Sequence, residues 1–555
     1  MDRKIIVMAK QISNKQLWWL VIAVALIWFS NLEYRKLIKP DEGRYAEIPR
    51  EMVVSGDWTT PRLNGLKYFE KPPLQYWTTA TAYTLFGEYH WTSRLWTGLT
   101  GFAGILLVWF AGLRLFGREA ANYAAILLGS SMLYVLMGHI NTLDMGVTFF
   151  LTLGIAGLLL GQTQSDTTQR RNWMLLAWAG LGLAVLSKGL MGLVLPGAVL
   201  FIYAVVQRDF SVFKRMHWLS GLAVFLLITA PWFYLVMKAN PEFFQRFFIY
   251  EHYLRFTTKI HDRYQPWYFF IPILLLGMLP WTVLMFDMLM RTWKGGARMA
   301  NVFSPERFLL IWAAFIFVFF SMSGSKLPSY VLPMFPALAL LMGKQLATMN
   351  LRRLFWLLAP ILPLMLLALG FAPFTARLAD TPLQVQGYGE YAGWLVAAAL
   401  LWSLGMIAAL VLLRRDNKLA AVLVLALSSL LAAQLGASGY NTIAKERSAY
   451  FIANAIHPYI KADESFYSVG TYEQTLPFYL KRTFTLVQYQ DEMAFGIMQE
   501  PQRWIPDIAS FAKVWQAQSA ALAIMPVTYY SQLKKLDFAM KIIYEDPQYI
   551  VVSKP

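Results

Sequence analysis

Residues 391–413 read YAGWLVAAALLWSLGMIAALVLL, and the basic residues Arg414, Arg415 and Lys418 follow within five positions. The run contains no charged side chain, and about 20 apolar residues are enough for a helix to cross the hydrocarbon core of a bilayer. A second apolar run covers 417–437. The pattern predicts two membrane-spanning helices joined by a short basic loop.

Eleven further apolar runs cover most of the chain. They are 17–32, 94–115, 119–138, 141–162, 173–187, 189–206, 217–238, 267–290, 307–323, 329–347 and 352–375. Of the 555 residues, 57% are hydrophobic and only 15% are charged, and the mean hydropathy is +0.44. Such a chain has too little polar surface to fold as a set of soluble domains, so we expect an α-helical polytopic membrane protein.

Basic residues gather in the loops on one side of these spans. Those loops hold Arg114, Arg118, Arg170, Arg171, Arg208, Lys214, Arg215, Arg291, Lys294, Arg298, Arg307, Arg352, Arg353, Arg414, Arg415 and Lys418. Cytoplasmic loops collect Lys and Arg, so the pattern predicts thirteen spanning helices, a cytoplasmic N-terminus and a C-terminus outside. Segment Pro73–Gly87 is short and polar. If this segment crossed the membrane, every later loop would change sides and the basic loops would lie outside the cytoplasm. We therefore expect an interfacial helix there.

The composition changes after about residue 440, where short β-rich runs alternate with helical patterns. The runs are Phe466–Val469, Phe484–Gln488, Ala520–Met525, Ile542–Tyr544 and Tyr549–Val552. They predict a small soluble α/β domain at 441–555. It would follow a transmembrane domain at 1–440 that carries two long outer loops, 33–93 and 239–266.

Composition also excludes several functions. Cysteine is absent, which rules out disulfides, zinc-finger spacings and thiol nucleophiles. Basic cytoplasmic loops and attraction to anionic membrane lipids account for the net charge of +17, so no nucleic-acid partner is expected. The sequence contains no Walker A, GxGxxG or kinase motif, which disfavours chemistry on nucleotides.

The first outer loop contains KPDEGRYAEIPREM at residues 39–52. We expect a helix with Asp41 as its cap, which would place Asp41, Arg44 and Tyr45 on one face. Spacing alone favours a plain amphipathic surface helix, in which Asp41 and Glu42 pair with nearby arginines, over a catalytic site.

Further candidate residues lie near the predicted outer surface. Two prolines hold Glu70 and Lys71 in a stiff turn, which suits either a site or a surface ion pair. Asp144 lies at the end of a predicted span, where an acidic residue usually faces a cavity. Lys188 and Lys326 lie in outer hairpins, where each could bind substrate or extend harmlessly to the interface.

The second outer loop is aromatic and basic between residues 242 and 259. Its simplest interpretation is an aromatic belt at the membrane interface. His252, with Glu70 or Glu251, could instead hold a divalent metal, although no HExxH or DxD spacing is present.

Together, these residues predict one outward-facing cavity in which carboxylates lie among cations. Carboxylates suit sugar hydroxyls, amines or a metal, and cations suit phosphate. An enzyme that works outside the cytoplasm without nucleotides needs a donor already activated in the membrane. A polyprenyl-phosphate sugar is such a donor, because its phosphate can leave.

Three motifs carry a resemblance to a known family: DEGRY at 41–45, YFEKPPL at 68–74 and SKLPSYVLP at 325–333. The chain resembles the membrane glycosyltransferases of GT-C type, and most closely the bacterial lipid A aminoarabinose transferases. The resemblance implies transfer of 4-amino-4-deoxy-L-arabinose from undecaprenyl phosphate to a phosphate of lipid A at the periplasmic face of the inner membrane. The added amine would confer resistance to polymyxin and other cationic peptides.

The resemblance also implies roles for individual residues. Asp41 matches the family's essential carboxylate, and Lys71 and Arg255 match its donor-phosphate ligands. Glu70 with His252 matches a possible zinc site. The expected catalytic residues are Asp41, Glu42 and Asp144; the expected substrate ligands are Lys71, Arg255, Arg44, Tyr45, Tyr68, Lys188, Lys326 and Tyr330; the expected metal ligands are Glu70 and His252.

We expect an inverting, single-displacement transfer in which Lys71, Arg255 and Lys326 stabilise the leaving phosphate. Two other functions remain open. A protein O-mannosyltransferase would use a hydroxyl acceptor and would need a true general base. A transporter is the non-enzyme alternative, which the lack of visible repeats and the one-sided long loops disfavour.

Overall fold

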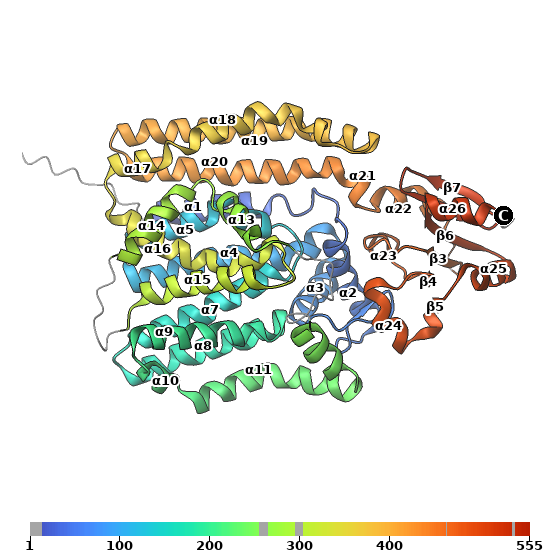
Figure 1. The fold of residues 1–555 in the computed structure, drawn as a ribbon, viewed down its shortest axis with the longest axis horizontal. Helices are drawn as coiled ribbons and strands as arrows, with labels where there is room; N and C mark the ends of the chain where they lie inside the picture. Colours follow the sequence, from blue (N-terminus) through green and yellow to red (C-terminus); the bar gives the residue numbers. More distant parts are fainter. Residues whose placement is uncertain (1–13, 255–264, 295–302, 462, 536–538) are drawn as a thin grey trace, which may run out of the picture.

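Long apolar helices lie side by side and make up most of the molecule, and a smaller domain built around a β-sheet lies beyond one end of them (Figure 1). The structure is a computed structural model that describes residues 14–254, 265–294, 303–461, 463–535 and 539–555. Two short helices, α2 and α3, lie between the helical bundle and the sheet domain (Figure 1).

The bundle follows the apolar runs of the sequence. Its helices are α1 (Asn14–Phe29), α4 (His90–Phe116), α5 (Arg118–Ser130), α6 (Met132–Met137), α7 (Asp144–Thr163), α8 (Thr167–Lys188), α9 (Met191–Gln207), α10 (Ser211–Lys214), α11 (Trp218–Ala239), η1 (Gln245–Leu254), η2 (Trp267–Phe269), α13 (Phe270–Gly277), α14 (Thr282–Lys294), α15 (Pro305–Met322), η3 (Pro328–Met334), α16 (Phe335–Thr348), α17 (Leu351–Leu358), α18 (Ile361–Phe371), η4 (Ala372–Leu378), α19 (Pro382–Arg414) and α20 (Lys418–Gly439).

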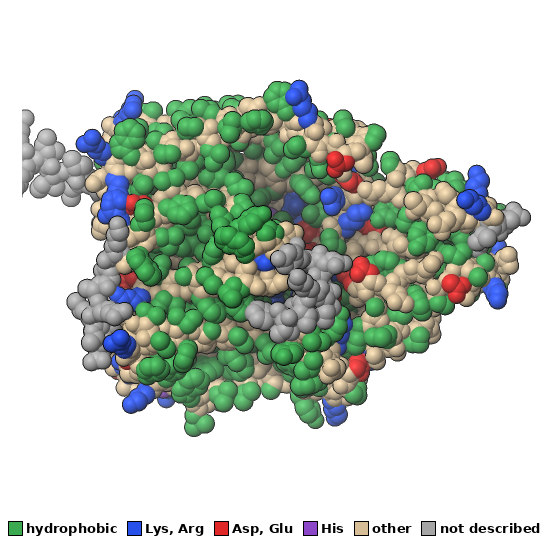
Figure 2. All heavy atoms as spheres, in the orientation of Figure 1, with side chains coloured by type: hydrophobic (Ala, Val, Ile, Leu, Met, Phe, Trp, Pro, Cys, Tyr) green, Lys and Arg blue, Asp and Glu red, His purple; other side chains and the backbone are tan. Residues whose placement is uncertain are grey.

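Each of the thirteen apolar runs coincides with one of these helices or with two or three consecutive ones. Within the described residues, eight helices are long and apolar enough to cross a membrane, or nine if α13 and α14, bent by 113°, form one span. Figure 2 shows hydrophobic side chains along the flank of the bundle and Lys and Arg side chains at its left-hand end. The prediction of a polytopic helical membrane protein is confirmed.

Small residues let neighbouring helices approach closely. A Cβ atom added at Gly180 of α8 would lie 2.6 Å from the backbone nitrogen of Gly154 in α7. Close backbone approach at glycine is a common way for helices to associate inside a membrane, where the hydrophobic effect gives little driving force between them.

The first outer loop folds as α2 (Asp41–Ser55), a two-stranded hairpin of β1 (Arg62–Leu63) and β2 (Leu66–Lys67), and α3 (Leu74–Phe86). Segment Pro73–Gly87 is therefore helical, as predicted. The expected cap was wrong: Asp41 is the first residue of α2, the N-cap position is Pro40, and no side chain caps the helix.

The C-terminal part is an α/β unit. It contains η5 (Tyr440–Ile443), α21 (Ala444–Arg447), α22 (Tyr450–Ile456), η6 (His457–Tyr459), β3 (Ser465–Val469), α23 (Leu476–Leu480), β4 (Thr485–Val487), η7 (Asp491–Met493), α24 (Ala494–Gln499), η8 (Pro501–Arg503), β5 (Trp504–Ile505), α25 (Ile508–Ala517), β6 (Ala521–Pro526), α26 (Val527–Lys534), β7 (Lys541–Glu545) and β8 (Tyr549–Ser553). The strand order is β5-β4-β3-β6-β8-β7.

Strands β5, β4, β3 and β6 are parallel, and β8 and β7 extend the sheet antiparallel. All five strands predicted from the sequence are present. The two-residue strand β5 was missed, because a pair of residues is too short to show an alternating pattern.

The outer loop and the C-terminal unit share one apolar core. Tyr45, Ile48 and Tyr76 from the loop belong to the same buried cluster as Phe466 and Leu522 from the sheet. Apolar groups buried against each other leave water together, so the two segments stabilise each other although they are far apart in sequence.

Polar contacts reinforce this docking. Asn64 Nδ2 donates to the Phe484 carbonyl at 2.8 Å, and the Phe484 amide donates to Asn64 Oδ1 at 2.7 Å. Gly43 lets the units approach closely, because a Cβ atom there would lie 2.5 Å from the Gln474 carbonyl oxygen. The C-terminal unit therefore lies directly on the α2 turn that carries Asp41 and Arg44.

Candidate functional site

A buried ion pair attaches the start of α2 to the bundle. Arg94 Nε donates to Glu42 Oε1 at 2.7 Å, and Arg94 Nη2 donates to Glu42 Oε2 at 2.8 Å. Both side chains are almost completely buried. Two parallel charge-assisted bonds fix orientation as well as distance.

The same pair fixes the chain before α2. Arg94 also donates to the carbonyls of Leu32, Arg35 and Lys36, and the amide of Asn141 donates to Glu42 at 3.0 Å. Burial alone would raise the pKa of Glu42, but the charge and hydrogen bonds of Arg94 outweigh burial and lower that pKa to about 2. Glu42 was expected among the catalytic groups. With both oxygens engaged, it positions the turn that carries Asp41.

Arg44 lies between two carboxylates. Its Nη1 is 3.7 Å from Asp41 Oδ1, and its Nη2 forms a close ion pair with Glu492 from η7 of the C-terminal unit. The guanidinium also lies over the ring of Tyr68, 5.7 Å from its centroid. Asp41 is about one-third exposed, whereas the Arg44 side chain is only 5% exposed, so Asp41 is the accessible carboxylate of this group.

Glu492 is in an unusual electrostatic position. Burial raises the pKa of Glu492, Arg44 opposes that shift, and the nearby Glu70, Asp491 and Asp41 add to it, giving a pKa of about 7. A carboxyl group with a pKa near 7 can hold or release a proton at neutral pH.

Three tyrosines border the same cluster. The rings of Tyr45 and Tyr76 lie 6.2 Å apart. The hydroxyls of Tyr68 and Tyr76 are buried and have no hydrogen-bond partner among the described residues. Buried hydroxyls without partners are costly in a finished core and are more readily explained in a site that awaits a polar ligand.

A second group combines three predicted residues from separate elements. Lys188, at the end of α8, forms a close ion pair with Asp144, at the start of α7. The Lys188 ammonium also lies 4.7 Å from the ring centroid of Tyr330 in η3. Leu143, next to Asp144, packs in the apolar cluster that contains Tyr45 and Tyr76, so the two groups adjoin the same core.

Other predicted cations have partners of their own. Lys71 Nζ donates to the Glu70 carbonyl at 3.0 Å. Lys326 Nζ donates to the carbonyls of Gln265 and Ser323 at 2.7 and 2.6 Å. Carbonyl oxygens that accept from an ammonium fix its orientation.

Arg255 lies outside the described residues, and so does the side chain of His252. The predicted phosphate clamp of Lys71 with Arg255 and the predicted metal pair of Glu70 with His252 therefore stay predictions. Among the side chains that the structure describes, no three His, Asp or Glu residues are grouped so as to hold a metal ion.

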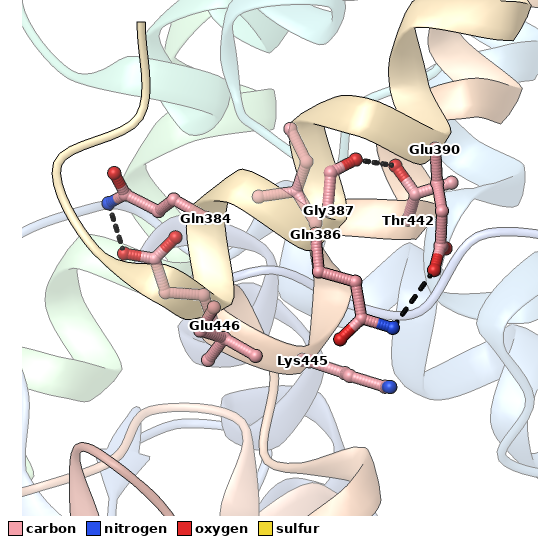
Figure 3. A pocket seen from close by; sticks show the side chains of 9 residues that line it. Gln384, Gln386, Gly387, Glu390, Thr442, Lys445 and Glu446 are labelled. Atoms are coloured by element: carbon pink, nitrogen blue, oxygen red, sulfur yellow. Dashed lines mark hydrogen bonds between the residues drawn. The ribbon is translucent and has the colours of Figure 1, made fainter. Parts of the chain in front are cut away.

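Two other hollows contain none of the predicted residues. One is a small pocket between the start of α19 and the η5–α21 turn, where Gln384 donates to Glu446 and Thr442 donates to the Gly387 carbonyl (Figure 3). The other is an apolar groove lined by α1, α4, α5 and α20. Neither combines acidic and basic groups around buried hydroxyls as the Arg44 cluster does.

Comparison with known proteins gives two family matches. Residues 452–554 match the model of the aminoarabinose transferase C-terminal domain, and residues 70–235 match that of the dolichyl-phosphate-mannose-protein mannosyltransferases. An undecaprenyl phosphate-α-4-amino-4-deoxy-L-arabinose arabinosyl transferase of Pseudomonas fluorescens is 33% identical over 61% of this chain and 58% of its own length. The alignment thus spans less than two thirds of that relative.

Longer matches exist. A transferase of the same name from Sodalis glossinidius is 32% identical over 69% of this chain and 71% of its own length. The crystal structure of ArnT from Cupriavidus metallidurans bound to undecaprenyl phosphate is 38% identical, covers 98% of this chain and 99% of that chain, and has a TM-score of 0.93. The chain belongs to the ArnT family of aminoarabinose transferases.

The family assignment gives this chain the membrane fold of the ArnT structure. A more distant structure, the archaeal oligosaccharyltransferase AglB from Archaeoglobus fulgidus, is 12% identical over 93% of this chain and 70% of its own, with a TM-score of 0.50. That likeness concerns the fold alone.

Sequence reasoning missed two residues of this ArnT-family site. Arg94 was counted as the start of a span, although an arginine at a span's edge needs a partner and is therefore a signal. Glu492 is part of a plain Asp-Glu-Met turn in the C-terminal unit. No local pattern indicates that this turn reaches α2.

The buried Glu42–Arg94 pair predicts strong energetic coupling. Arg94→Met and Glu42→Gln should each lower the free energy of unfolding by about 3–5 kcal/mol, because each leaves one buried charge or donor without its partner. The double variant should lose much less free energy of unfolding than the sum of the two single losses. Thermal unfolding of the purified protein in detergent measures all three.

Lys67→Met is the matched control. It breaks a 2.6 Å ion pair with Glu242 whose side chains are 20% and 22% exposed, so its effect should be about 0–1 kcal/mol. If the double variant lost the full sum of the free energies of unfolding lost by Arg94→Met and Glu42→Gln, the two residues would act independently. That result would contradict the account.

Proposed function

We propose that the protein transfers 4-amino-4-deoxy-L-arabinose from undecaprenyl phosphate to a phosphate of lipid A. The observation that carries the proposal is the cluster in which Asp41 and Glu492 flank Arg44 beside two buried tyrosine hydroxyls. Carboxylates suit an amino sugar, and lysines suit phosphate. Membership in the ArnT family, and a relative crystallised with undecaprenyl phosphate, support the same donor.

We also propose the topology. The thirteen apolar runs would each cross the bacterial inner membrane, with the N-terminus in the cytoplasm and residues 441–555 in the periplasm. Residues 1–440 would form the transmembrane catalytic domain, and α2 and α3 would lie at the periplasmic interface. The clustering of basic side chains at the end of the bundle away from the sheet domain (Figure 2) supports this orientation.

A reporter fused after Pro555 tests the orientation. Alkaline phosphatase, which is active only outside the cytoplasm, should be active in the fusion. A fusion that is inactive, while a cytoplasmic reporter at the same place is active, would overturn the thirteen-span topology.

The reaction would be a single displacement with inversion. An ionised oxygen of the lipid A phosphate attacks the anomeric carbon of the sugar and forms the new C–O bond. The bond from that carbon to undecaprenyl phosphate breaks, and the departing phosphate oxygen takes the electron pair. No proton needs to be removed from the acceptor, because the second pKa of a phosphate monoester is about 6.

In this reaction, Lys71 would bind the donor phosphate and stabilise its growing charge, as would Arg255 from the second outer loop. Lys326, held by two carbonyls, would also stabilise the leaving phosphate, and Lys188, paired with Asp144, would bind substrate. Asp41 would orient the sugar, and Glu42 would hold Asp41 in place through Arg94. Tyr45, Tyr68 and Tyr330 would line the cavity.

A divalent metal such as zinc is implied for the family by the pair Glu70 and His252. The side chain of His252 lies outside the described residues, so this pair stays a prediction. We therefore derive no catalytic step from a metal.

A second candidate is sugar transfer to a protein hydroxyl, because residues 70–235 match the mannosyltransferase model. That reaction would require Asp41 to remove a proton from the acceptor. Purified protein given a mannosyl donor and a peptide acceptor would form a glycopeptide only under this alternative.

The proposed transfer can be tested in vesicles that contain the purified protein, undecaprenyl phosphate-aminoarabinose and lipid A. Mass spectrometry should show lipid A carrying one added aminoarabinose. Asp41→Asn should abolish the product and remain folded, because Asp41 is partly exposed and its nearest cation is 3.7 Å away. Unmodified lipid A with the wild-type protein would refute the proposed function, and full activity of Asp41→Asn would remove that residue from the site.

A further inference from the structure

Glu492 reaches the site from the far end of the sequence. It lies in η7 of the C-terminal unit, and it pairs with Arg44 of α2 through Oε2. Its side chain is only 14% exposed. Within the described residues its second oxygen, Oε1, accepts no hydrogen bond, so this oxygen has capacity for a further donor.

The surroundings of Glu492 form a built site. Tyr68 is 3% exposed, and its hydroxyl has no hydrogen-bond partner among the described residues. The Arg44 guanidinium lies over the Tyr68 ring, 5.7 Å from its centroid, so Tyr68 belongs to this cluster. A buried hydroxyl without a partner points to a polar ligand that is absent from the structure.

The charge of the cluster favours a cation. Asp41 and Glu492 both lie against Arg44, and Glu70 and Asp491 also interact with Glu492. When Glu492 is ionised, Arg44 and Lys71 together do not offset all of these carboxylates, and a nearby ammonium favours that ionised form. A carboxylate and an ammonium form short, strong, charge-assisted hydrogen bonds, whereas a sugar hydroxyl would leave the surplus charge unbalanced.

We propose that Glu492 is a specificity-determining residue that receives the ammonium group of the transferred sugar, together with Asp41. The C-terminal domain would thus supply part of the donor-sugar site. Arg44 would hold Glu492 in place through Oε2 and leave Oε1 for the ammonium. This inference rests on the proposed function, because only an amino sugar carries the required charge.

The test uses the full-length purified protein and three ligands. They are undecaprenyl phosphate-aminoarabinose, the same lipid with arabinose, in which a hydroxyl replaces the amine, and undecaprenyl phosphate alone. Dissociation constants are measured for the wild type, for Glu492→Gln and for Glu500→Gln. Glutamine keeps the size of the side chain and removes its charge.

Glu500→Gln is the matched control. Glu500 lies in the same C-terminal unit and pairs with Arg62 of the outer loop at 2.7 Å, so it reports on docking of the two segments and not on the sugar site. Glu500→Gln should bind all three ligands with the affinity of the wild type, or should lose affinity for all three by the same factor.

Glu492→Gln should weaken binding of the amino donor by about 10- to 100-fold, as expected for loss of a charge-assisted hydrogen bond. Its affinities for the arabinose lipid and for undecaprenyl phosphate alone should stay within about twofold of the wild type, so the preference for the amine is lost. An unchanged affinity for the amino donor would overturn the inference. An equal loss of affinity for all three ligands would also overturn the inference, since Glu492 would then only support the fold.

If the proposed function itself is wrong, the wild-type protein gives a different result in these experiments. The wild type would then bind the amino donor without transferring it to lipid A, or would not bind undecaprenyl phosphate at all. Normal transfer by the wild type, combined with an unaltered amine preference in Glu492→Gln, would refute the role of Glu492 alone.

Discussion

The buried ion pair between Glu42 and Arg94 is the constraint on which the site depends. It joins α2 to the first helix of the bundle after the outer loop, and its further bonds fix the carbonyls of Leu32, Arg35 and Lys36. Two charges removed from water are stable only when each has its partner. The turn that carries Asp41 is therefore held in one place, which is the preorganisation that a transferase needs in order to orient a sugar.

The second constraint is the core shared by the outer loop and the C-terminal domain. Tyr45 and Ile48 cannot be buried unless the sheet domain covers them, and the strands lose part of their apolar cover without α2. Gly43 permits that contact, because a side chain at this position would collide with the Gln474 carbonyl. The C-terminal domain thus lies against the outer loop, and its Glu492 side chain pairs with Arg44 there.

The sequence predicts the fold well wherever the physics is local. An apolar run such as 391–413 can only be a buried or membrane helix, and a short run of β-branched and aromatic residues such as Tyr549–Val552 indicates a strand. Asp144, Lys188 and Tyr330, all expected at the site, are neighbours in the structure, and the role expected for the turn at residue 41 stays a prediction. Local sequence patterns could not predict contacts between segments that are far apart in the sequence. The pairing of Glu42 with Arg94 was missed because Arg94 is 52 positions away, and Glu492 was missed because it is 448 positions from Arg44.

The central claim is that the donor sugar binds between α2 and the C-terminal domain. The most direct measurement is an experimental structure of the protein with undecaprenyl phosphate-aminoarabinose bound and no acceptor present. We predict that the sugar amine lies within hydrogen-bond distance of Glu492 and Asp41, with the Glu42–Arg94 pair intact beneath them. A sugar bound elsewhere on the bundle, with Glu492 still paired only to Arg44, would contradict the account.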